Sequence, residues 1–158
     1  MSTDLTRNPD DIPSGETDYG TQLEQTLARE RSMLRVLIDT LPDPVWFKDM
    51  QGTYLACNRR FEQFLGRPAE HIVGQTDYAL MHREQADFFR HHDRLALERD
   101  APSINEEEVV FASDGHREIL ETIKAPVRDE HGRLQGVLGI GRNITRRRQT
   151  ESMPPQSR

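Results

Sequence analysis

The sequence is poor in cysteine and in long apolar runs. Cys57 is the single cysteine among 158 residues, so the chain can form no intramolecular disulfide, which suits a reducing compartment. No stretch approaches the ~20 consecutive apolar residues of a membrane-spanning helix. Residues 1–20 lack the charged and apolar segments of a secretory signal. We therefore predict a cytoplasmic protein with no membrane partner.

Positive charge is also scarce. The formal net charge is -6, and basic residues gather only at Arg142 and at Arg146, Arg147 and Arg148. Because phosphate binding needs a local surplus of lysine and arginine, this short run is weak support for a nucleic-acid site. We interpret it as the solvated start of a helix and predict no nucleic-acid partner.

The motifs of several enzyme classes are absent. The chain has no glycine-rich phosphate loop, no Cys-x-x-Cys pair, no His-Glu-x-x-His motif and no nucleophile elbow. His92 and Asp93 are neighbours on a predicted helix, where adjacent side chains point in different directions, so we expect no acid–base pair. The run Asn-Glu-Glu-Glu at 105–108 is interpreted as a solvated acidic segment beside a strand. We predict neither catalysis nor a metal site.

The N-terminal part divides into a tail and a helix. Residues 1–20 carry proline, glycine and aspartate with little apolar spacing, which predicts a disordered tail. Over residues 21–41, leucines recur on three- and four-residue steps, which predicts an amphipathic helix that ends before Pro42. The leucine stripe either docks on its own domain or forms a dimer seam, and we favour a homodimer through the Leu23–Leu41 helix. The stripe consists of Leu23, Leu27, Leu34, Leu37 and Leu41.

Residues 42–145 contain two strands, a series of helices and three further strands in that order. Two apolar runs flank a turn at 49–52, which predicts a β-hairpin. The longest helix is expected over about residues 82–99. One stripe of this helix collects Ala86, Phe89, Asp93 and Ala96. The order of elements predicts an α+β fold, with one antiparallel sheet and helices on one face.

Apolar residues occur on both sides of the later strands. Ile119 and Ile123 alternate with Leu120, whereas a sheet with one solvated face would carry polar residues at alternate positions. We therefore expect the second face of the sheet to be partly covered. The helix over residues 21–41 is the expected cover, either in the same protomer or across a dimer.

At this point the residues resemble a known family. The segment LPDPVWFKD at 41–49, followed by Gly52 and by NRRF at 58–61, resembles the opening of bacterial PAS domains. The segment APVRDEHG at 125–132 resembles a closing hairpin of that family, and GIGRNIT at 139–145 resembles its exit signature. Further matches in the expected order are Gly66, Gly74, Thr76, Asp77 and the turn Ser113-Asp114-Gly115.

The resemblance covers roughly residues 34–150. It implies a PAS-like five-stranded antiparallel sheet with short helices on one face, preceded by the amphipathic helix. It further implies a sensory module in signal transduction, which binds a small organic ligand or a partner and passes its state through terminal helices. The receiver would be an effector domain in cis or in trans, such as a histidine kinase or a cyclic-dinucleotide enzyme. Residues 146–158 are expected to hold the start of the exit helix and a tail.

One departure from the family concerns the signal exit, Asn143-Ile144-Thr145. The family usually has Asp-Ile-Thr at this point. Asparagine keeps the hydrogen-bonding capacity of aspartate but loses the carboxylate charge. We therefore do not expect an ion pair from this position to the exit helix.

The predicted ligand site is a largely apolar cleft between the sheet and the helices, with a few polar groups. The expected wall consists of Phe47, Phe64, Phe89, Ile119 and Leu138. The expected polar contacts are Tyr54, Asn58, His92 and Asp93. The alternative is that the aromatic residues form an ordinary core, in which case the chain is a ligand-free dimerisation or adaptor module.

No cofactor is required by the sequence, and none is identified. Non-covalent FAD stays open as a redox-sensing alternative. The segment CNRRF at 57–61 reverses the order of the Asn-Cys-Arg-Phe motif of LOV domains, so we expect no cysteinyl photoadduct. Haem is disfavoured because His82, His91 and His92 are expected on the polar surface of a helix.

Overall fold

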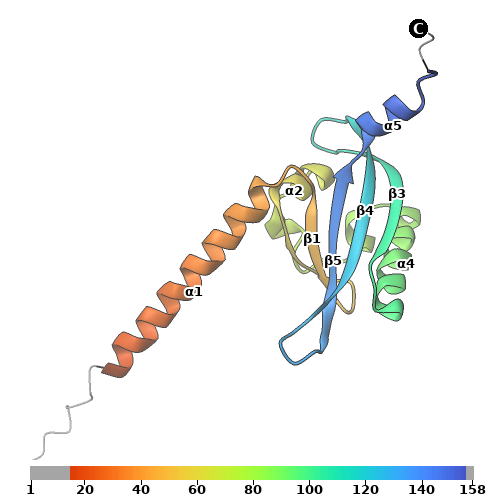
Figure 1. Ribbon diagram of the computed structural model, residues 1–158. Helices are drawn as coiled ribbons and strands as arrows, with labels where there is room; N and C mark the ends of the chain where they lie inside the picture. The colour runs from red at the N-terminus through yellow and green to blue at the C-terminus, as the bar shows by residue number, and fades with distance from the viewer. Residues whose placement is uncertain (1–14, 156–158) are drawn as a thin grey trace, which may run out of the picture. The chain divides into compact units, whose positions relative to one another are not determined.

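The computed structural model describes residues 15–155 of the chain (Figure 1). The chain divides into two compact units, residues 1–36 and residues 37–158. The first unit holds most of the long helix α1, Gly15–Thr40, and the second unit holds the sheet and the remaining helices. The division follows from the contacts of the chain, because the second unit alone buries a shared apolar core.

Helix α1 begins six residues earlier than the predicted start at residue 21. The extension is polar, and Gln22 Nε2 donates to Asp18 Oδ2 one turn away at 3.4 Å. These first turns have no apolar stripe, so apolar spacing does not indicate a helix here. Local helix propensity and contacts between residues four apart stabilise them instead. The prediction of disorder was therefore wrong for residues 15–20, while residues 1–14 lie outside the described part. No helix within residues 15–155 is both long and apolar enough to cross a membrane.

The leucine stripe of α1 is exposed. Leu23, Leu27, Leu34 and Leu37 each leave between 47 and 61% of their surface accessible. Valine and methionine side chains between them are equally accessible, with Val36 at 65% and Met33 at 61%. The helix therefore presents a large apolar area for its length.

Five antiparallel strands form one sheet in the order β2-β1-β5-β4-β3. This arrangement confirms the predicted α+β fold with a single antiparallel sheet. Figure 1 shows α2 and α4 behind the strands of this unit. The strands are β1 Val45–Asp49, β2 Tyr54–Cys57, β3 Ser103–Val110, β4 Arg117–Arg128 and β5 Leu134–Asn143.

The hairpin from β1 to β2 forms as the sequence predicts. Gly52 has a φ of 85°, which residues with a Cβ rarely adopt, and its N–H donates to Asp49 O at 3.1 Å. The Asp49 carboxylate accepts hydrogen bonds from the backbone N–H groups of Gln51 and Thr53, both at 2.9 Å. The aspartate and the glycine thus fix the turn and, with it, the register of the two strands.

Four helical segments connect β2 to β3, as the sequence predicts. They are α2 Arg59–Leu65, the 3₁₀ turn η1 Ala69–His71, α3 Asp77–Leu80 and α4 Arg83–Arg99. Asn58 caps α2 through a bond from Phe61 N to its Oδ1 at 3.1 Å. Gly66 ends α2 in the left-handed conformation, with φ of 69°. The buried residues of α4 are Ala86, Phe89, Asp93 and Ala96, which confirms the predicted stripe.

The inner face of the sheet packs against these helices. Trp46, Tyr54, Phe61, Phe64 and Phe111 belong to its buried apolar cluster. The Trp46 ring stacks on Phe61 with centroids 5.0 Å apart. Trp46 also lies opposite Gly139 of β5, where an added Cβ would meet the indole at 2.1 Å. A side chain at 139 would therefore collide with the indole, and glycine allows the close approach.

Strand alternation sends three predicted cleft residues to the outer face. Trp46 and Lys48 face inward, so Phe47 between them faces outward, and it pairs with Leu138 of β5. Ile119 lies between the buried Glu118 and Leu120 and is only half-buried. The prediction that these three residues line the cleft was therefore wrong. A shift of one position along a strand changes the face, and the apolar residues on both faces concealed which was inner.

Candidate functional site

Two lysines and two aspartates are buried between the sheet and the helices. Lys48 extends inward from β1 and Lys124 from β4, and each is 1% exposed. Asp77 is the first residue of α3, and Asp93 lies on the buried stripe of α4; both are fully buried. We call these four residues the charge network. The sequence analysis identified only Asp93 among them as a site residue.

Every member of the charge network has an ion-pair partner, although Asp93 Oδ1 accepts no hydrogen bond. Lys48 Nζ lies 2.5 Å from Asp77 Oδ2 and 2.9 Å from Asp93 Oδ2. Lys124 Nζ lies 3.0 Å from Asp93 Oδ1 and donates to Phe89 O at 2.8 Å. Two cations and two anions balance, and Asp93 joins both lysines. The network therefore links two strands to two helices through charged hydrogen bonds.

Tyr54 extends the charge network to β2. Its hydroxyl donates to Asp77 Oδ1 at 2.5 Å. Burial raises the pKa of Tyr54 well above its usual value, and the Asp77 carboxylate raises it further. The tyrosine therefore stays a neutral hydrogen-bond donor over the whole physiological pH range.

Burial and ion pairing oppose each other at Asp93. Burial alone would raise the pKa of this carboxyl, but the ammonium groups of Lys48 and Lys124 reverse the effect and leave the pKa below its usual value. At Lys124, burial lowers the pKa although Asp93 opposes the change. Because well-packed apolar residues can stabilise a core as well as buried ion pairs do, stability alone does not account for such a network.

A second polar row continues from the charge network to the edge of the sheet. Ser103, Asn105 and Glu107 face inward at alternate positions of β3, and we call them the edge row. His92 Nδ1 of α4 lies 3.3 Å from Ser103 Oγ. Thr122, which is buried on β4 opposite Asn105, lies 3.5 Å from Glu107 Oε1 through its hydroxyl.

The acidic segment of β3 differs from its prediction. Residues 105–108 belong to the strand, and only alternate members are solvated. Burial raises the pKa of Glu107 to about 7, although Lys124 and Thr122 act in the opposite direction. The even spacing of the inward positions 103, 105, 107 and 109 was the available signal, but the first three are polar and concealed a strand.

Of the other residues predicted to contact a ligand, four are buried on the inner side of the sheet and one lies at its edge. Tyr54, Phe64, Phe89 and Asp93 lie on the inner side and are buried. His92 is half-buried beside the edge row. Whether these residues bind a ligand stays a prediction.

Asn58 is fully buried and engaged in the fold itself. Its Oδ1 accepts hydrogen bonds from Val45 N and Phe61 N, and its Nδ2 donates to Ile38 O and Asp43 O. An asparagine amide has two donor and two acceptor sites, so these four bonds use its capacity. In this arrangement Asn58 holds α2 and β1 together, and no hydrogen-bonding site of its amide is free for a ligand.

A groove of about 440 Å³ lies between the end of α2, the start of α4 and the end of β3. Phe64, Leu80, Met81 and Val110 provide its apolar lining, and Arg67 and His82 are among its polar residues. No residue of the charge network lines it. The groove and the buried network are therefore separate features of this unit.

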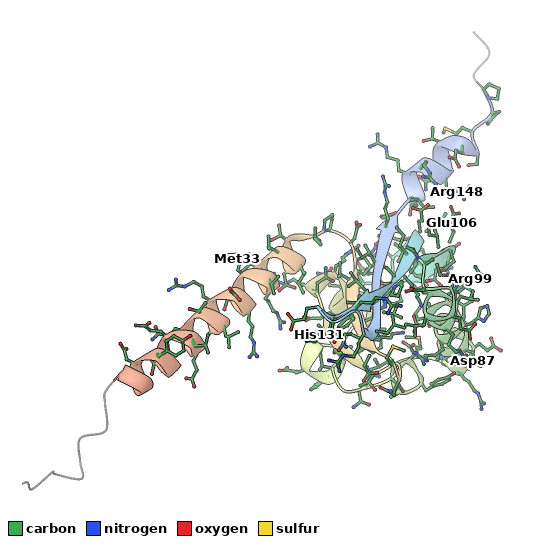
Figure 2. The ribbon with its side chains drawn as sticks, turned by 60° about the horizontal axis from the view of Figure 1, so that its bottom comes forward. Met33, Asp87, Arg99, Glu106, His131 and Arg148 are labelled. Atoms are coloured by element: carbon green, nitrogen blue, oxygen red, sulfur yellow. The ribbon has the colours of Figure 1, made fainter. Side chains whose placement is uncertain are left out.

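The exit from the sheet is held by hydrogen bonds and ion pairs. Asn143 Oδ1 accepts from Thr145 N at 3.0 Å and from Thr145 Oγ1 at 2.6 Å, and Ile119 N donates to Thr145 Oγ1 at 2.9 Å. Helix α5, Thr145–Glu151, follows at once. Its Arg148 pairs with Glu106 of β3, and Figure 2 shows the two labelled residues side by side. Asn143 has no charge to pair with α5, and the ion pair between the sheet and this helix is made by Glu106 of β3 and Arg148 of α5.

Comparisons with known proteins agree with this architecture. The family described as PAS fold matches residues 38–149. The methanogenesis regulatory histidine kinase FilI of Methanothrix harundinacea (strain 6Ac) is 28% identical over 128 residues, which are 81% of this chain but 14% of FilI. The chain therefore spans about a seventh of this curated relative.

Two solved structures show the same fold. The PAS domain of a protein from Colwellia psychrerythraea has a TM-score of 0.58 and 24% identity, over 76% of this chain and 98% of that one. VqmA bound to DPO has a TM-score of 0.65 and 25% identity, over 73% of this chain and 58% of that one. The sheet order, the intervening helices and the matched residues lead to one conclusion: the chain belongs to the PAS-fold family, whose members act as sensory modules of signalling proteins.

Proposed function

We propose that this sensory module recognises a small organic ligand between its sheet and its helices, at the charge network and the edge row, which together we call the compartment. The charge network is the observation that carries the proposal. It joins β1, β4, α3 and α4 around Asp93, so a molecule that contacts any member changes the forces on all four elements. The proposal requires that these elements exchange between two arrangements. A ligand shifts the equilibrium between them only if it binds one more tightly than the other, and charged hydrogen bonds to the ligand can supply a large difference in affinity.

The output of the module is the second part of the proposal. Strand β5 leads directly to Asn143 and Thr145, and a displacement of the sheet moves the first turn of α5. An effector domain in cis or in trans, such as a histidine kinase or a cyclic-dinucleotide enzyme, would receive this displacement. FilI is a histidine kinase by name, which supports this kind of output. VqmA, which shares the fold, was solved with DPO bound, and this supports an input by a bound ligand.

Native mass spectrometry and thermal-shift screening of the whole chain test the ligand. We expect at least one compound to add mass to the folded protein and to raise its melting temperature, since binding to the native state alone stabilises it. NMR shifts in residues of β1, β4 and α4 would place the compound in the compartment. Shifts confined to the groove near Met81, or no response across a broad library, would contradict the proposal.

The exposed leucine stripe of α1 favours dimerisation as a second function. A stripe that leaves Leu34 61% exposed and Leu37 58% exposed is typical of a surface that another helix covers. We propose that two copies pair through this helix. Light scattering on the whole chain and on residues 41–158 provides the measurement, and we expect a dimer that becomes a monomer after truncation. A dimer of unchanged mass after truncation would exclude α1 as the interface.

The two functions give separable results. Dimerisation without any ligand response would identify the chain as an adaptor module. A ligand response in a monomer would support sensing, and it would exclude an output that depends on two paired α1 helices. The cytoplasmic location stays a prediction from the composition and has no part in either experiment.

A further inference from the structure

The amide of Asn105 is the least satisfied polar group in the described interior. Its side-chain nitrogen and oxygen are both buried, and neither has a hydrogen-bond partner among residues 15–155. Other buried polar side chains show the contrast: Asn58 makes four hydrogen bonds, and Thr122 has a partner in Glu107. A buried amide without partners costs folding free energy, so its retention at this position needs a reason.

The surroundings of Asn105 are polar and lie at the edge of the sheet. On β3 it lies between Ser103 and Glu107, and Thr122 faces it from β4. Strand β3 is the edge of the sheet, and both Asn105 and Glu107 are only partly buried. A small molecule can therefore approach the edge row between β3 and α4 without separating two paired strands, and it reaches the covered amide of Asn105 by displacing the groups above it.

The charges near the edge row disfavour an ion. Lys124, the nearest cation on the inner face, is held by Asp93 at 3.0 Å and by Phe89 O. Each lysine of the charge network is already paired with an aspartate, and the Arg90 guanidinium also lies 3.3 Å from Asp93, so these cations are engaged and would have to leave a carboxylate to neutralise an anion. Glu107 would repel an anion when ionised, and a cation would have to shed water beside Lys124. A neutral molecule avoids these costs.

The geometry of the carboxamide defines the functional groups of the ligand. The C=O and the NH₂ of Asn105 are attached to one carbon and so lie side by side. Their best complement is a ligand with an N–H and a C=O in the same relation, which pairs with both groups at once. A cis amide or a lactam has this arrangement.

We propose that the edge row binds a small neutral lactam or cis amide, whose adjacent C=O and N–H pair with the Asn105 carboxamide while Thr122 and Glu107 contact its rim. This inference rests on the proposed sensory function and specifies its ligand class. It makes Asn105 a specificity-determining residue, because a molecule without the donor–acceptor pair leaves the buried amide unsatisfied.

A matched pair of probes tests the inference on the whole ¹⁵N-labelled chain. 2-Pyridone has the lactam pair, and N-methyl-2-pyridone has the same ring and carbonyl without the N–H. We expect 2-pyridone to shift the side-chain NH₂ signals of Asn105, and its N-methyl analogue to bind about tenfold more weakly, the loss of one hydrogen bond. Picolinate, an anionic ring of similar size, should leave these signals unchanged.

Variants separate the role of the amide from that of the fold. Asn105→Leu should melt no lower than the wild type and should lose the response to 2-pyridone. Asn105→Asp, which keeps the shape and adds a charge, should lose it as well. Glu108→Leu also exchanges a polar side chain of β3 for leucine, but on the outward side of the strand, and should keep the response.

Equal binding of the two pyridones, or a response that survives in Asn105→Leu, would overturn the inference. If water alone satisfies the amide, neither pyridone will shift the Asn105 signals, and this result would also overturn the inference. A compound of another class found in the ligand screen would leave the sensory function standing while this inference falls. An empty compartment across the whole library would remove both.

Discussion

Asp93→Asn should destabilise the fold more than any other single loss of a carboxylate on α4. Asp93 lies 2.9 Å from Lys48 Nζ, 3.0 Å from Lys124 Nζ and 3.3 Å from Arg90 Nη1. At an effective dielectric constant of about 20, one such contact amounts to about 5 kcal/mol before desolvation is counted. Loss of one partner from a buried pair costs about 3–5 kcal/mol, because the other charge stays buried. We expect a loss in this range.

Urea unfolding followed by circular dichroism measures the effect. Asp87→Asn is the matched control, because Asp87 lies on the same helix, is exposed, and accepts one bond from the Tyr78 hydroxyl at 2.7 Å (Figure 2). Its loss should change the free energy of unfolding by less than about 1 kcal/mol. Combining Asp93→Asn with Lys124→Met should cost less than the sum of the single changes, because the double variant removes both partners.

The pH dependence gives an independent check. The folded-state pKa of Asp93 is depressed, so its contribution is complete above the unfolded pKa and disappears as the pH falls through the folded pKa. The stability difference between wild type and Asp93→Asn should therefore shrink in acid. A cost below about 1 kcal/mol at neutral pH, or strictly additive single and double variants, would refute the description of the network as a coupled unit.

Three further predictions concern the surrounding charges. Burial raises the pKa of Glu107 to about 7, so wild-type stability should fall as the pH rises from about 4.5 through 7, and Glu107→Gln should lose this fall in urea titrations at pH 5 and pH 8. Glu106→Gln removes the β3 partner of Arg148 and leaves only its pair with Glu151 inside α5, so amide exchange should accelerate in α5 while global stability changes by less than about 1 kcal/mol; unchanged exchange would show that the pair with β3 does not hold the helix. Glu118 and Asp114 bond the two ring nitrogens of His116 and raise its pKa, so its NMR titration should lie above the usual value for histidine, and Glu118→Gln should lower it. The stability that His116 contributes is present at low pH and lost as the pH rises through the raised pKa; a titration at the ordinary value would contradict the doubly bonded ring.

Much of the fold could be predicted because local residues determine it. Gly52 and Asp49 fix the first hairpin, Asn58 and Gly66 bound α2, and the order of strands and helices admits one antiparallel sheet. The early start of α1 at Gly15 was missed because its first turns have no apolar face. Residues 105–108 were expected beside a strand, whereas β3 includes them and begins at Ser103; the related reason is that its first inward positions are polar.

The site could be predicted only in part because its members are far apart in the sequence. Lys48 and Asp93 are separated by 45 positions, and no spacing rule connects them. A lysine in a strand is usually solvated, so neither Lys48 nor Lys124 stood out as buried. The misplacement of Phe47, Ile119 and Leu138 has another cause: with apolar residues on both faces, periodicity identifies strands but not their inner side.

The contact between Trp46 and Gly139 has a practical consequence. Trp46 is the single tryptophan of the chain, and its indole lies on the inner face two positions before Lys48. Its fluorescence therefore comes from the packed core, without tryptophan background from the surface or from α1. The protein carries its own optical reporter, so a rearrangement of the core, such as the one expected on binding of a ligand at the proposed site, can be followed in real time without an attached dye.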